Sequence, residues 1–193
     1  MMPLWTHAEL VAATGGKAIG EFDANGVAFD SREIGKGDLF FALKGEATDG
    51  HLFVDKAFAN GAAGAIVSEP VDFPHILVSD TFAALNDLAR ASRARMDGKV
   101  VGVTGSAGKT GTKEALFAAL DRSSRGKAHR SVKSYNNHVG VPLSLSRMPR
   151  DTEFGVFEMG MNHARELSAL TQFVRPHVAI ITTIAPAHIE HFG

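Results

Sequence analysis

The chain has 193 residues, enough for one large domain or two small ones, and its content of 45% hydrophobic and 21% charged residues is typical of a globular protein. Lysine and arginine (20) nearly balance aspartate and glutamate (21), so we expect no nucleic-acid partner, which would usually need a clearly basic surface. The absence of cysteine excludes disulfides, thiolate metal sites and a cysteine nucleophile.

The N-terminus and the apolar runs indicate neither export nor membrane insertion. Residues 1–16 lack a basic segment and include His7 and Glu9, unlike a signal peptide. No apolar run approaches the roughly 18 residues of a membrane span. We therefore expect a soluble, cytoplasmic α/β protein with no membrane partner.

The first part of the chain predicts short strands alternating with helices. Thr6 and Glu9 form a capping box at the start of a helix that ends at Gly15. A second helix is expected at 52–60. Short apolar runs predict strands at 18–22, 26–30, 39–43, 65–67 and 76–78. This alternation favours a small mixed sheet in an N-terminal domain of residues 1–80.

A linker helix at 81–97 is expected to lead into a second domain at 98–193. Strands are predicted at 99–104, 154–158 and 178–183, and helices at 110–120, 142–147 and 165–174. The basic stretch 122–133 is interpreted as a solvated loop. The predicted fold class is therefore α/β, with a small mixed-sheet domain followed by a P-loop-type parallel-sheet domain. The second sheet would keep one edge and some apolar faces uncovered, which favours an N-terminal portion of a longer protein.

The strongest local motif lies between a predicted strand and a predicted helix. Its residues are Gly105, Ser106, Ala107, Gly108, Lys109 and Thr110. Glycines let backbone N–H groups turn around an anion, and a helix N-terminus adds partial positive charge. Lys109 would reach the terminal phosphates of a nucleotide and Thr110 would coordinate Mg²⁺. Only the G-x-x-G-K-T core of the phosphate-binding pattern is present, and a plain glycine-rich turn is the alternative.

Two further residues follow strands that would end at the same edge of the sheet. Glu158 ends the strand 154–158 and could supply an acidic Mg²⁺ ligand, or be a solvated strand-end acid. His188 follows the strand 178–183 and could bind a second metal or a phosphate. A single histidine is more often structural than a ligand.

Polar residues in two loops are open to either interpretation. Asn136 and Asn137 could contact an uncharged polar ligand, although ordinary turn chemistry explains them equally well. Arg32, after Asp30 and Ser31, could bind phosphate in a bidentate manner or belong to a helix cap.

Taken together, several segments resemble the Mur ligases, the ATP-dependent amide ligases of peptidoglycan synthesis. The resemblance runs over nearly the whole chain. The segments that carry it are 105–110, Asn-Asn-His-Val-Gly-Val-Pro at 136–142, Glu-Met-Gly-Met-Asn-His at 158–163 and Pro-Ala-His-Ile-Glu at 186–190, with Asp-Ser-Arg at 30–32 and Asp-Gly-His at 49–51.

The resemblance implies roles for individual residues. It assigns ATP binding to 105–110 with Asn136 and Asn137, Mg²⁺ to Thr110 and Glu158, and a second metal to His188. The catalytic groups would be Lys109, Glu158 and His188. Residues contacting the UDP-sugar would be Ser31, Arg32, Asp49 and His51.

Within the family, the segments at 136–142 and 158–163 point to members that join D-alanyl-D-alanine to UDP-N-acetylmuramoyl-tripeptide through an acyl phosphate. The family has three domains, so the resemblance implies that this chain carries an incomplete ATP-binding domain and is inactive alone. A monomer is expected at full length. Three alternatives stay open: the family member that adds the third amino acid, an unrelated P-loop NTPase, and a non-catalytic nucleotide-binding module.

Overall fold

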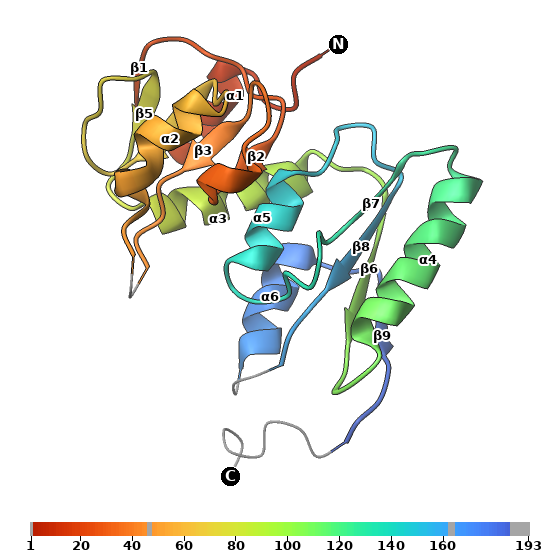
Figure 1. Cartoon of the computed structure of the whole chain (residues 1–193). Coiled ribbons are helices and arrows are strands. Elements are labelled where there is room, and N and C mark those ends of the chain that lie inside the picture. Colours follow the sequence, from red (N-terminus) through yellow and green to blue (C-terminus); the bar gives the residue numbers. More distant parts are fainter. Residues whose placement is uncertain (1, 46–47, 162–164, 186–193) are drawn as a thin grey trace. The chain divides into compact units, whose positions relative to one another are not determined.

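The computed structural model describes residues 2–45, 48–161 and 165–185 (Figure 1). The chain divides into two compact units, Met1–Ala91 and Ser92–Gly193, hereafter the N-terminal and C-terminal units. The division falls inside helix α3 (Thr81–Ala94), which spans most of the predicted linker helix. Each unit contains one β-sheet, so the predicted α/β class is confirmed.

The N-terminal unit is built on a five-stranded mixed sheet with the order β1-β5-β4-β3-β2. Strand β1 is antiparallel to β5, and the other neighbouring pairs are parallel. The strands are β1 (Lys17–Ile19), β2 (Val27–Ala28), β3 (Leu39–Phe41), β4 (Gly64–Val67) and β5 (His75–Leu77). The two runs predicted as the first strands thus form short strands at opposite edges of the sheet.

Several helical segments of this unit begin where the sequence provides side-chain caps. Helix α1 (His7–Thr14) has the complete capping box of Thr6 and Glu9 and ends at Gly15, whose φ of 65° is left-handed. The remaining helices are the 3₁₀ turns η1 (Ser31–Glu33) and η2 (Gly50–Phe53) and helix α2 (Val54–Ala59). Helix α2 packs on one face of the sheet, where alternate residues of β3 and β4 meet Val54 and Ala57.

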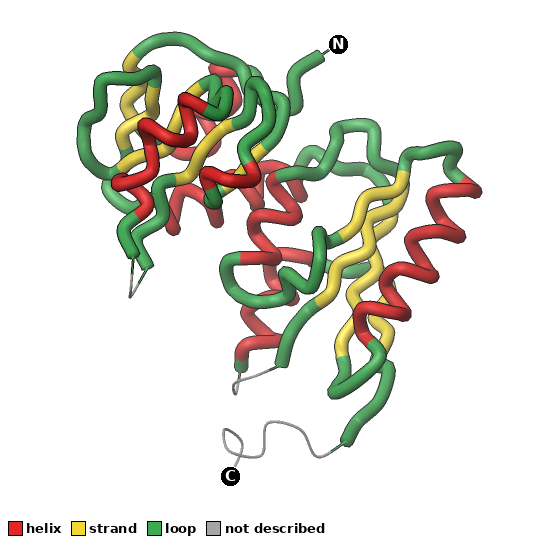
Figure 2. Tube along the Cα trace, in the orientation of Figure 1, coloured by secondary structure: helices red, strands yellow, loops and turns green. Residues whose placement is uncertain are grey.

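The C-terminal unit contains a four-stranded, fully parallel sheet with the order β7-β8-β6-β9. Its elements are β6 (Lys99–Thr104), α4 (Lys109–Ser123), β7 (Ala128–Arg130), α5 (Gly140–Ser146), β8 (Phe154–Glu158), α6 (Glu166–Val174) and β9 (Val178–Ile181). Helix α4 lies on one side of the sheet and helices α5 and α6 on the other (Figures 1 and 2). The sheet therefore has the two-sided cover of a parallel α/β fold.

The basic stretch 122–133 differs from the predicted solvated loop. Helix α4 extends to Ser123, and residues 128–130 form β7, the edge strand paired with β8. His129 donates from Nε2 to the Ser144 carbonyl (2.8 Å), and the Arg130 guanidinium lies over the Phe117 ring and pairs with Glu114. These contacts satisfy the polar side chains, so a strand forms where charge alone predicted a loop.

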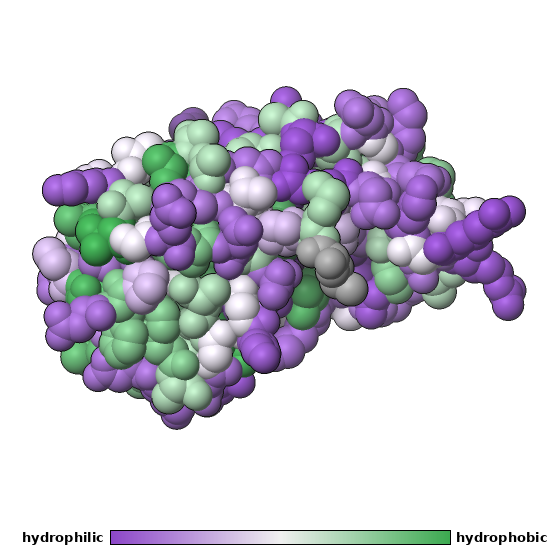
Figure 3. Space-filling model, turned by 90° about the horizontal axis from the view of Figure 1, so that it is seen from above, coloured by the Kyte–Doolittle hydropathy of each residue, from purple (hydrophilic) through white to green (hydrophobic). Residues whose placement is uncertain are grey.

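The surface is mixed in polarity. Figure 3 shows hydrophilic side chains spread over the displayed face among hydrophobic ones. Val178 and Ile181 on the edge strand β9 are exposed. Within the described ranges, every helix is too short or too polar to cross a lipid bilayer.

Candidate nucleotide-binding site

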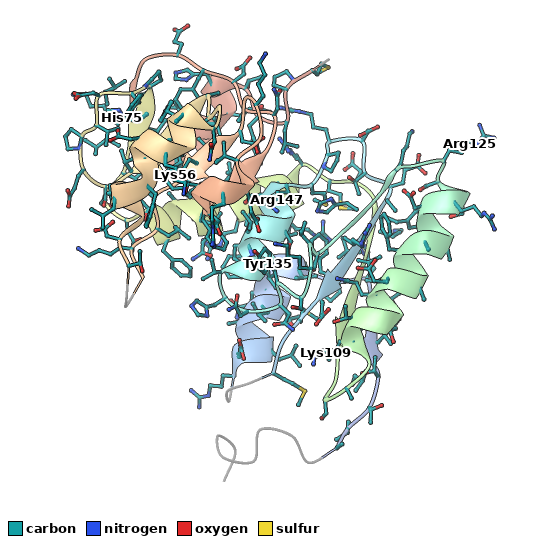
Figure 4. All side chains as sticks on the ribbon, in the orientation of Figure 1. Lys56, His75, Lys109, Arg125, Tyr135 and Arg147 are labelled. Atoms are coloured by element: carbon teal, nitrogen blue, oxygen red, sulfur yellow. The ribbon has the colours of Figure 1, made fainter. Side chains whose placement is uncertain are left out.

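The glycine-rich motif lies in the expected strand–loop–helix setting. Strand β6 ends at Thr104 and helix α4 begins at Lys109, so residues 105–108 form the connecting loop. Because β6, β8 and β9 are parallel, their carboxyl ends meet at one edge of the sheet, next to this loop. Figure 4 shows Lys109 at that edge, where α4 begins.

Two loop positions require glycine. Gly105 has a φ of 135° and Gly108 a φ of 83°, which residues with side chains rarely adopt. A Cβ atom on Gly105 would also collide with the hydroxyl oxygen of Thr182. The loop therefore holds a backbone conformation that only this residue pattern permits, with its helix N-terminus open to an anion.

The segment after β9 lies against this loop. The Ser106 N–H donates to the Thr183 carbonyl (2.7 Å), and the Ser106 hydroxyl exchanges hydrogen bonds with the Ala185 backbone (3.0 and 3.1 Å). The Thr182 hydroxyl donates to the Ala107 carbonyl. These contacts fix the start of the segment that continues to His188, which lies outside the described residues.

The Lys109 side chain turns back onto its own loop. Its ammonium donates to the Gly105 carbonyl at 2.7 Å. The positive charge of Lys109 therefore lies beside the backbone of the glycine loop.

Glu158 is a buried carboxylate at the centre of a polar cluster. It lies at the end of β8 and is 1% exposed. Its Oε2 accepts a hydrogen bond from the Thr110 hydroxyl (3.0 Å) and its Oε1 accepts one from Asn136 Nδ2 (2.8 Å). Its backbone N–H donates to the Ser131 hydroxyl (3.0 Å). Three residues predicted separately thus meet at one point, from α4, β8 and the loop after β7.

The donor set of this cluster fits Mg²⁺. At metal–oxygen distances of about 2.0–2.1 Å in octahedral geometry, neighbouring ligand oxygens lie about 3 Å apart. Thr110 Oγ1 and Glu158 Oε2 are 3.0 Å apart, so both could bind one ion. In the described part of the chain no group of three or more histidine, aspartate or glutamate residues is placed to hold a metal. Remaining ligands would be phosphate oxygens and water, as is usual for Mg²⁺.

The two neighbouring asparagines have different roles. Asn136 is partly buried and contacts Glu158, whereas Asn137 is exposed. Asn137 Oδ1 accepts hydrogen bonds from the N–H groups of Val139 (3.2 Å) and Gly140 (2.9 Å), at the start of α5. The structure thus brings Asn136 into the cluster and uses the Asn137 side chain in turn chemistry.

Lys113 also belongs to this cluster, although no sequence motif indicated it. It is fully buried, and its ammonium lies 3.9 Å from Glu158 Oε2 and 3.1 Å from Glu114 Oε1. Lys113 stands four residues after Lys109 and three after Thr110, which places all three close together on one side of α4. This spacing of three and four residues is the sequence signal that could have pointed to Lys113.

Burial and charge shift two pKa values nearby. Burial raises the pKa of Glu114, but the hydrogen bond from Lys113 and the charges of Lys113 and Arg130 outweigh burial and hold it below its usual value. Burial lowers the pKa of His129 from 6.5 to about 4, against the opposing effect of its hydrogen bond to Ser144. Glu114 is therefore charged and His129 neutral near pH 7.

In the N-terminal unit, Ser31 and Arg32 lie in η1. Ser31 is buried, and its carbonyl accepts a hydrogen bond from Asn60 (2.8 Å). The Arg32 side chain is 77% exposed and is held by Asp30, with Nη2 at 2.6 Å from Oδ2 and Nε at 2.9 Å from Oδ1. Asp30 also caps η1 through the Arg32 N–H. The cap interpretation therefore holds for Asp30, while the Arg32 guanidinium stays accessible.

Asp49 and His51 form a second local group in this unit. His51 Nδ1 lies 2.7 Å from Asp49 Oδ1, and His51 Nε2 accepts a hydrogen bond from the Ser68 N–H (2.9 Å). These partners assign the proton to Nδ1. Hydrogen bonds from the His51 backbone and side chain lower the pKa of Asp49. The pair fastens the loop before η2 to the end of β4.

Comparison with protein-family models matches residues 103–193 to the Mur ligase middle domain. Residues 23–102 match the Mur ligase family, catalytic domain. The two adjoining matches meet inside β6 and together span most of the chain.

Two curated relatives with the same name match most of this chain. The chain is 39% identical to the UDP-N-acetylmuramoyl-tripeptide–D-alanyl-D-alanine ligase of Rickettsia prowazekii, with 98% of this chain and 42% of that protein covered. It is 41% identical to the ligase of the same name from Bacillus subtilis, with 88% and 38% covered. The chain thus spans about two fifths of the length of these relatives.

Solved structures agree with the sequence comparisons. The chain is similar to MurF from Acinetobacter baumannii, with a TM-score of 0.83, 38% identity, and 98% of this chain and 43% of that chain covered. It is also similar to the MurF ligase from Thermotoga maritima in complex with ADP, with a TM-score of 0.69, 34% identity, and 85% and 38% covered. Both confirm the fold of the described units.

Proposed function

The chain belongs to the Mur ligase family, and on that premise we propose that the whole protein joins D-alanyl-D-alanine to UDP-N-acetylmuramoyl-tripeptide at the expense of ATP. The relatives named above carry this activity in their names. The reaction would supply a precursor of peptidoglycan. Its nucleotide-linked substrate is water-soluble, so we expect the protein to act in the cytoplasm, as a monomer at full length.

The observation that carries the proposal is the meeting of Thr110, Asn136 and Glu158 beside the loop that ends at Lys109. A loop that needs glycine, a lysine and a hydroxyl–carboxylate pair are the parts that phosphoryl transfer from a nucleotide requires. The relative from Thermotoga maritima was solved with ADP, which supports an adenine nucleotide. We assign ATP to residues 105–110 with Asn136, and assign Asn137 to the same end of the site.

The proposed chemistry needs no protein nucleophile. The tripeptide carboxylate attacks the γ-phosphate of ATP, giving an acyl phosphate and ADP, and the amine of D-alanyl-D-alanine then attacks the acyl carbon and releases phosphate. Lys109 would leave the Gly105 carbonyl and neutralise charge on the transferred phosphoryl oxygens. Thr110 and Glu158 would hold Mg²⁺, which shields phosphate charge when bound. Rate enhancement would come from positioning and electrostatics.

We propose that substrate binding, the connection between the domains and the second metal site belong to other segments of the chain. Residues 1–80 would bind the UDP-sugar, with the exposed Arg32 guanidinium contacting phosphate and Ser31, Asp49 and His51 shaping the loops. Residues 81–97 would link this domain to the ATP-binding part at 98–193. His188 would hold a second metal. Because this chain spans about two fifths of its relatives' length, we expect it to bind nucleotide but not to form the amide alone.

Two measurements test this function. Calorimetry of the 193-residue chain should detect ATP binding in the presence of Mg²⁺, and Lys109→Met should abolish most of it. A chimera joining this chain to the remaining part of the Acinetobacter baumannii relative should release ADP only when both the tripeptide nucleotide and D-alanyl-D-alanine are present. A chain that does not bind ATP, or a chimera that prefers a single amino acid to the dipeptide, would contradict the proposal.

A further inference from the structure

Lys113 is a fully buried lysine whose three ammonium hydrogens all have acceptors. The Ser131 carbonyl (3.1 Å), the Lys133 carbonyl and Glu114 Oε1 (3.1 Å) each accept one. Burying an ammonium is costly unless it is paired and hydrogen-bonded. A residue that merely filled this space could be apolar, so the charge at this position calls for an explanation.

The contact of Lys113 with Glu158 is electrostatic rather than a hydrogen bond. The ammonium lies 3.9 Å from Glu158 Oε2, beyond hydrogen-bond range, and both residues are buried. The carboxylate oxygens instead accept from Thr110 and Asn136. Lys113 therefore attracts the carboxylate without occupying the lone pairs that a cation would need.

The charge of Lys113 does not oppose a cation strongly. Glu114 lies closer to the ammonium than Glu158 does, and its lowered pKa keeps it ionised. Glu114 therefore offsets part of the Lys113 charge, although it also pairs with Arg130 (2.9 Å). Lys113 acts on Glu158 as an orienting contact whose charge is partly offset.

The two carbonyls held by Lys113 belong to the segment that completes the cluster. Ser131 accepts at its hydroxyl from the Glu158 N–H, and Lys133 lies three residues before Asn136. Asn136 in turn donates to Glu158 and accepts at its carbonyl from the Gly160 N–H (2.7 Å). One ammonium on α4 therefore holds the start of the segment that runs from β7 to Asn136 and α5.

We propose that Lys113 is a positioning residue for the magnesium–nucleotide site. It orients the Glu158 carboxylate and the Asn136 segment before Mg²⁺ binds. The oxygens of Thr110 and Glu158 are then already in position to coordinate the ion. This inference rests on the proposed function, because it concerns the Mg²⁺ that would accompany ATP. Partners that orient a metal ligand typically change metal affinity 10- to 100-fold when they are removed.

The experiment measures ATP affinity of the 193-residue chain by calorimetry, once with excess Mg²⁺ and once with EDTA. The ratio of the two dissociation constants gives the factor by which Mg²⁺ increases the affinity for ATP, hereafter the Mg²⁺ gain. Lys113→Met should reduce that gain about 10-fold or more, while affinity in EDTA stays near that of the parent chain because the loop and Lys109 are intact. Lys127→Met is the matched control, since Lys127 pairs with Glu153 at the surface, and it should leave both affinities unchanged.

The outcomes separate the inference from the function. If the parent chain binds no ATP, both the proposed function and the inference about Lys113 are overturned. If it binds ATP with a gain from Mg²⁺ that Lys113→Met retains, only the inference is overturned. Equal losses with Mg²⁺ and with EDTA would show a general structural role and would also overturn it. Should Lys113→Met fail to fold, Lys113→Arg, which keeps the charge but moves it, should weaken the Mg²⁺ gain selectively, and an unchanged gain contradicts the proposal.

Discussion

The two units assemble their polar groups in different ways. In the C-terminal unit, Thr110 and Glu158 are 48 residues apart in the chain, yet their side chains are hydrogen-bonded next to the buried Lys113. In the N-terminal unit, Asp30 pairs with Arg32 and Asp49 with His51, each two residues away. The first arrangement depends on the sheet topology, whereas the second depends on local turns.

This difference has an energetic consequence. Buried charges that lose a partner are strongly destabilising, whereas exposed ion pairs contribute little. The cluster at Glu158 should therefore be sensitive to single changes, and the pairs around Arg32 should tolerate them. The comparison predicts a graded series of effects.

The largest effect is expected from Lys113→Met. Removing the ammonium leaves Glu158 buried without its nearby charge and two carbonyls without a donor, so the C-terminal unit should lose about 3–5 kcal/mol of unfolding free energy. Urea unfolding followed by hydrogen exchange in residues 92–185 measures it. Adding Glu158→Gln should recover part of the loss. A double variant no more stable than Lys113→Met would mean that the two charges are not coupled.

The next effect is a difference in acid sensitivity. His129 has a folded pKa of about 4, below its unfolded value, so the unfolded state takes up a proton first as the pH falls. Stability of the C-terminal unit should drop between pH 6.5 and 4 by up to about 3 kcal/mol. His129→Gln, which keeps a donor for the Ser144 carbonyl, should flatten that part of the profile.

The N-terminal unit should respond in a more acidic range. The pKa of Asp49 is lowered, so its stabilising contribution is present above its ordinary value of 3.8 and is lost as the pH falls through the folded pKa. Hydrogen exchange of the two units across pH 3–7 distinguishes the two ranges. Coincident acid transitions would contradict the comparison.

A smaller effect, confined to ligand binding, is expected from Lys109→Met. The Lys109 ammonium donates to the Gly105 carbonyl of its own loop, and one such hydrogen bond at a partly exposed position contributes little, so stability should change little. Loss of a charge-assisted contact to phosphate should weaken ATP binding by about 1.5–3 kcal/mol, or roughly 10- to 100-fold. Calorimetry measures the affinity, and urea unfolding serves as the control. Unchanged affinity would remove Lys109 from the site.

The smallest effect is expected from Arg32→Ala. The guanidinium is exposed and pairs with Asp30 across a local turn, so the N-terminal unit should lose about 0.5 kcal/mol or less. If Arg32 contacts the UDP-sugar as proposed, affinity for uridine diphosphate should nevertheless fall measurably. A large loss of stability without a change in uridine diphosphate affinity would mean that Arg32 stabilises the fold and does not bind the ligand.

Much of this fold could be predicted from local signals. The capping box of Thr6 and Glu9, the strand at 99–104 and the glycine loop before Lys109 were all predicted where the structure has them. Each depends on residues close together in the chain. The strand β7 was missed because its sequence is basic, and its side-chain partners, the Glu114 carboxylate and the Ser144 carbonyl, come from other elements.

The candidate site was predictable only in outline. Parallel strands imply that Glu158 and the loop share an edge, but they do not reveal which of Asn136 and Asn137 reaches the carboxylate. Lys113 is one of 20 lysines and arginines, and its burial depends on carbonyls 18 and 20 residues away. Such contacts follow from packing rather than from residue type or spacing.

The most direct test of the account is the effect of Glu158→Gln on ATP binding by this chain. With Mg²⁺ present, the variant should bind ATP markedly more weakly than the parent chain, and in EDTA the two should bind equally. Binding of ATP and Mg²⁺ by Glu158→Gln as tight as by the parent chain would contradict the claim that the cluster at the end of β8 is the magnesium–nucleotide site.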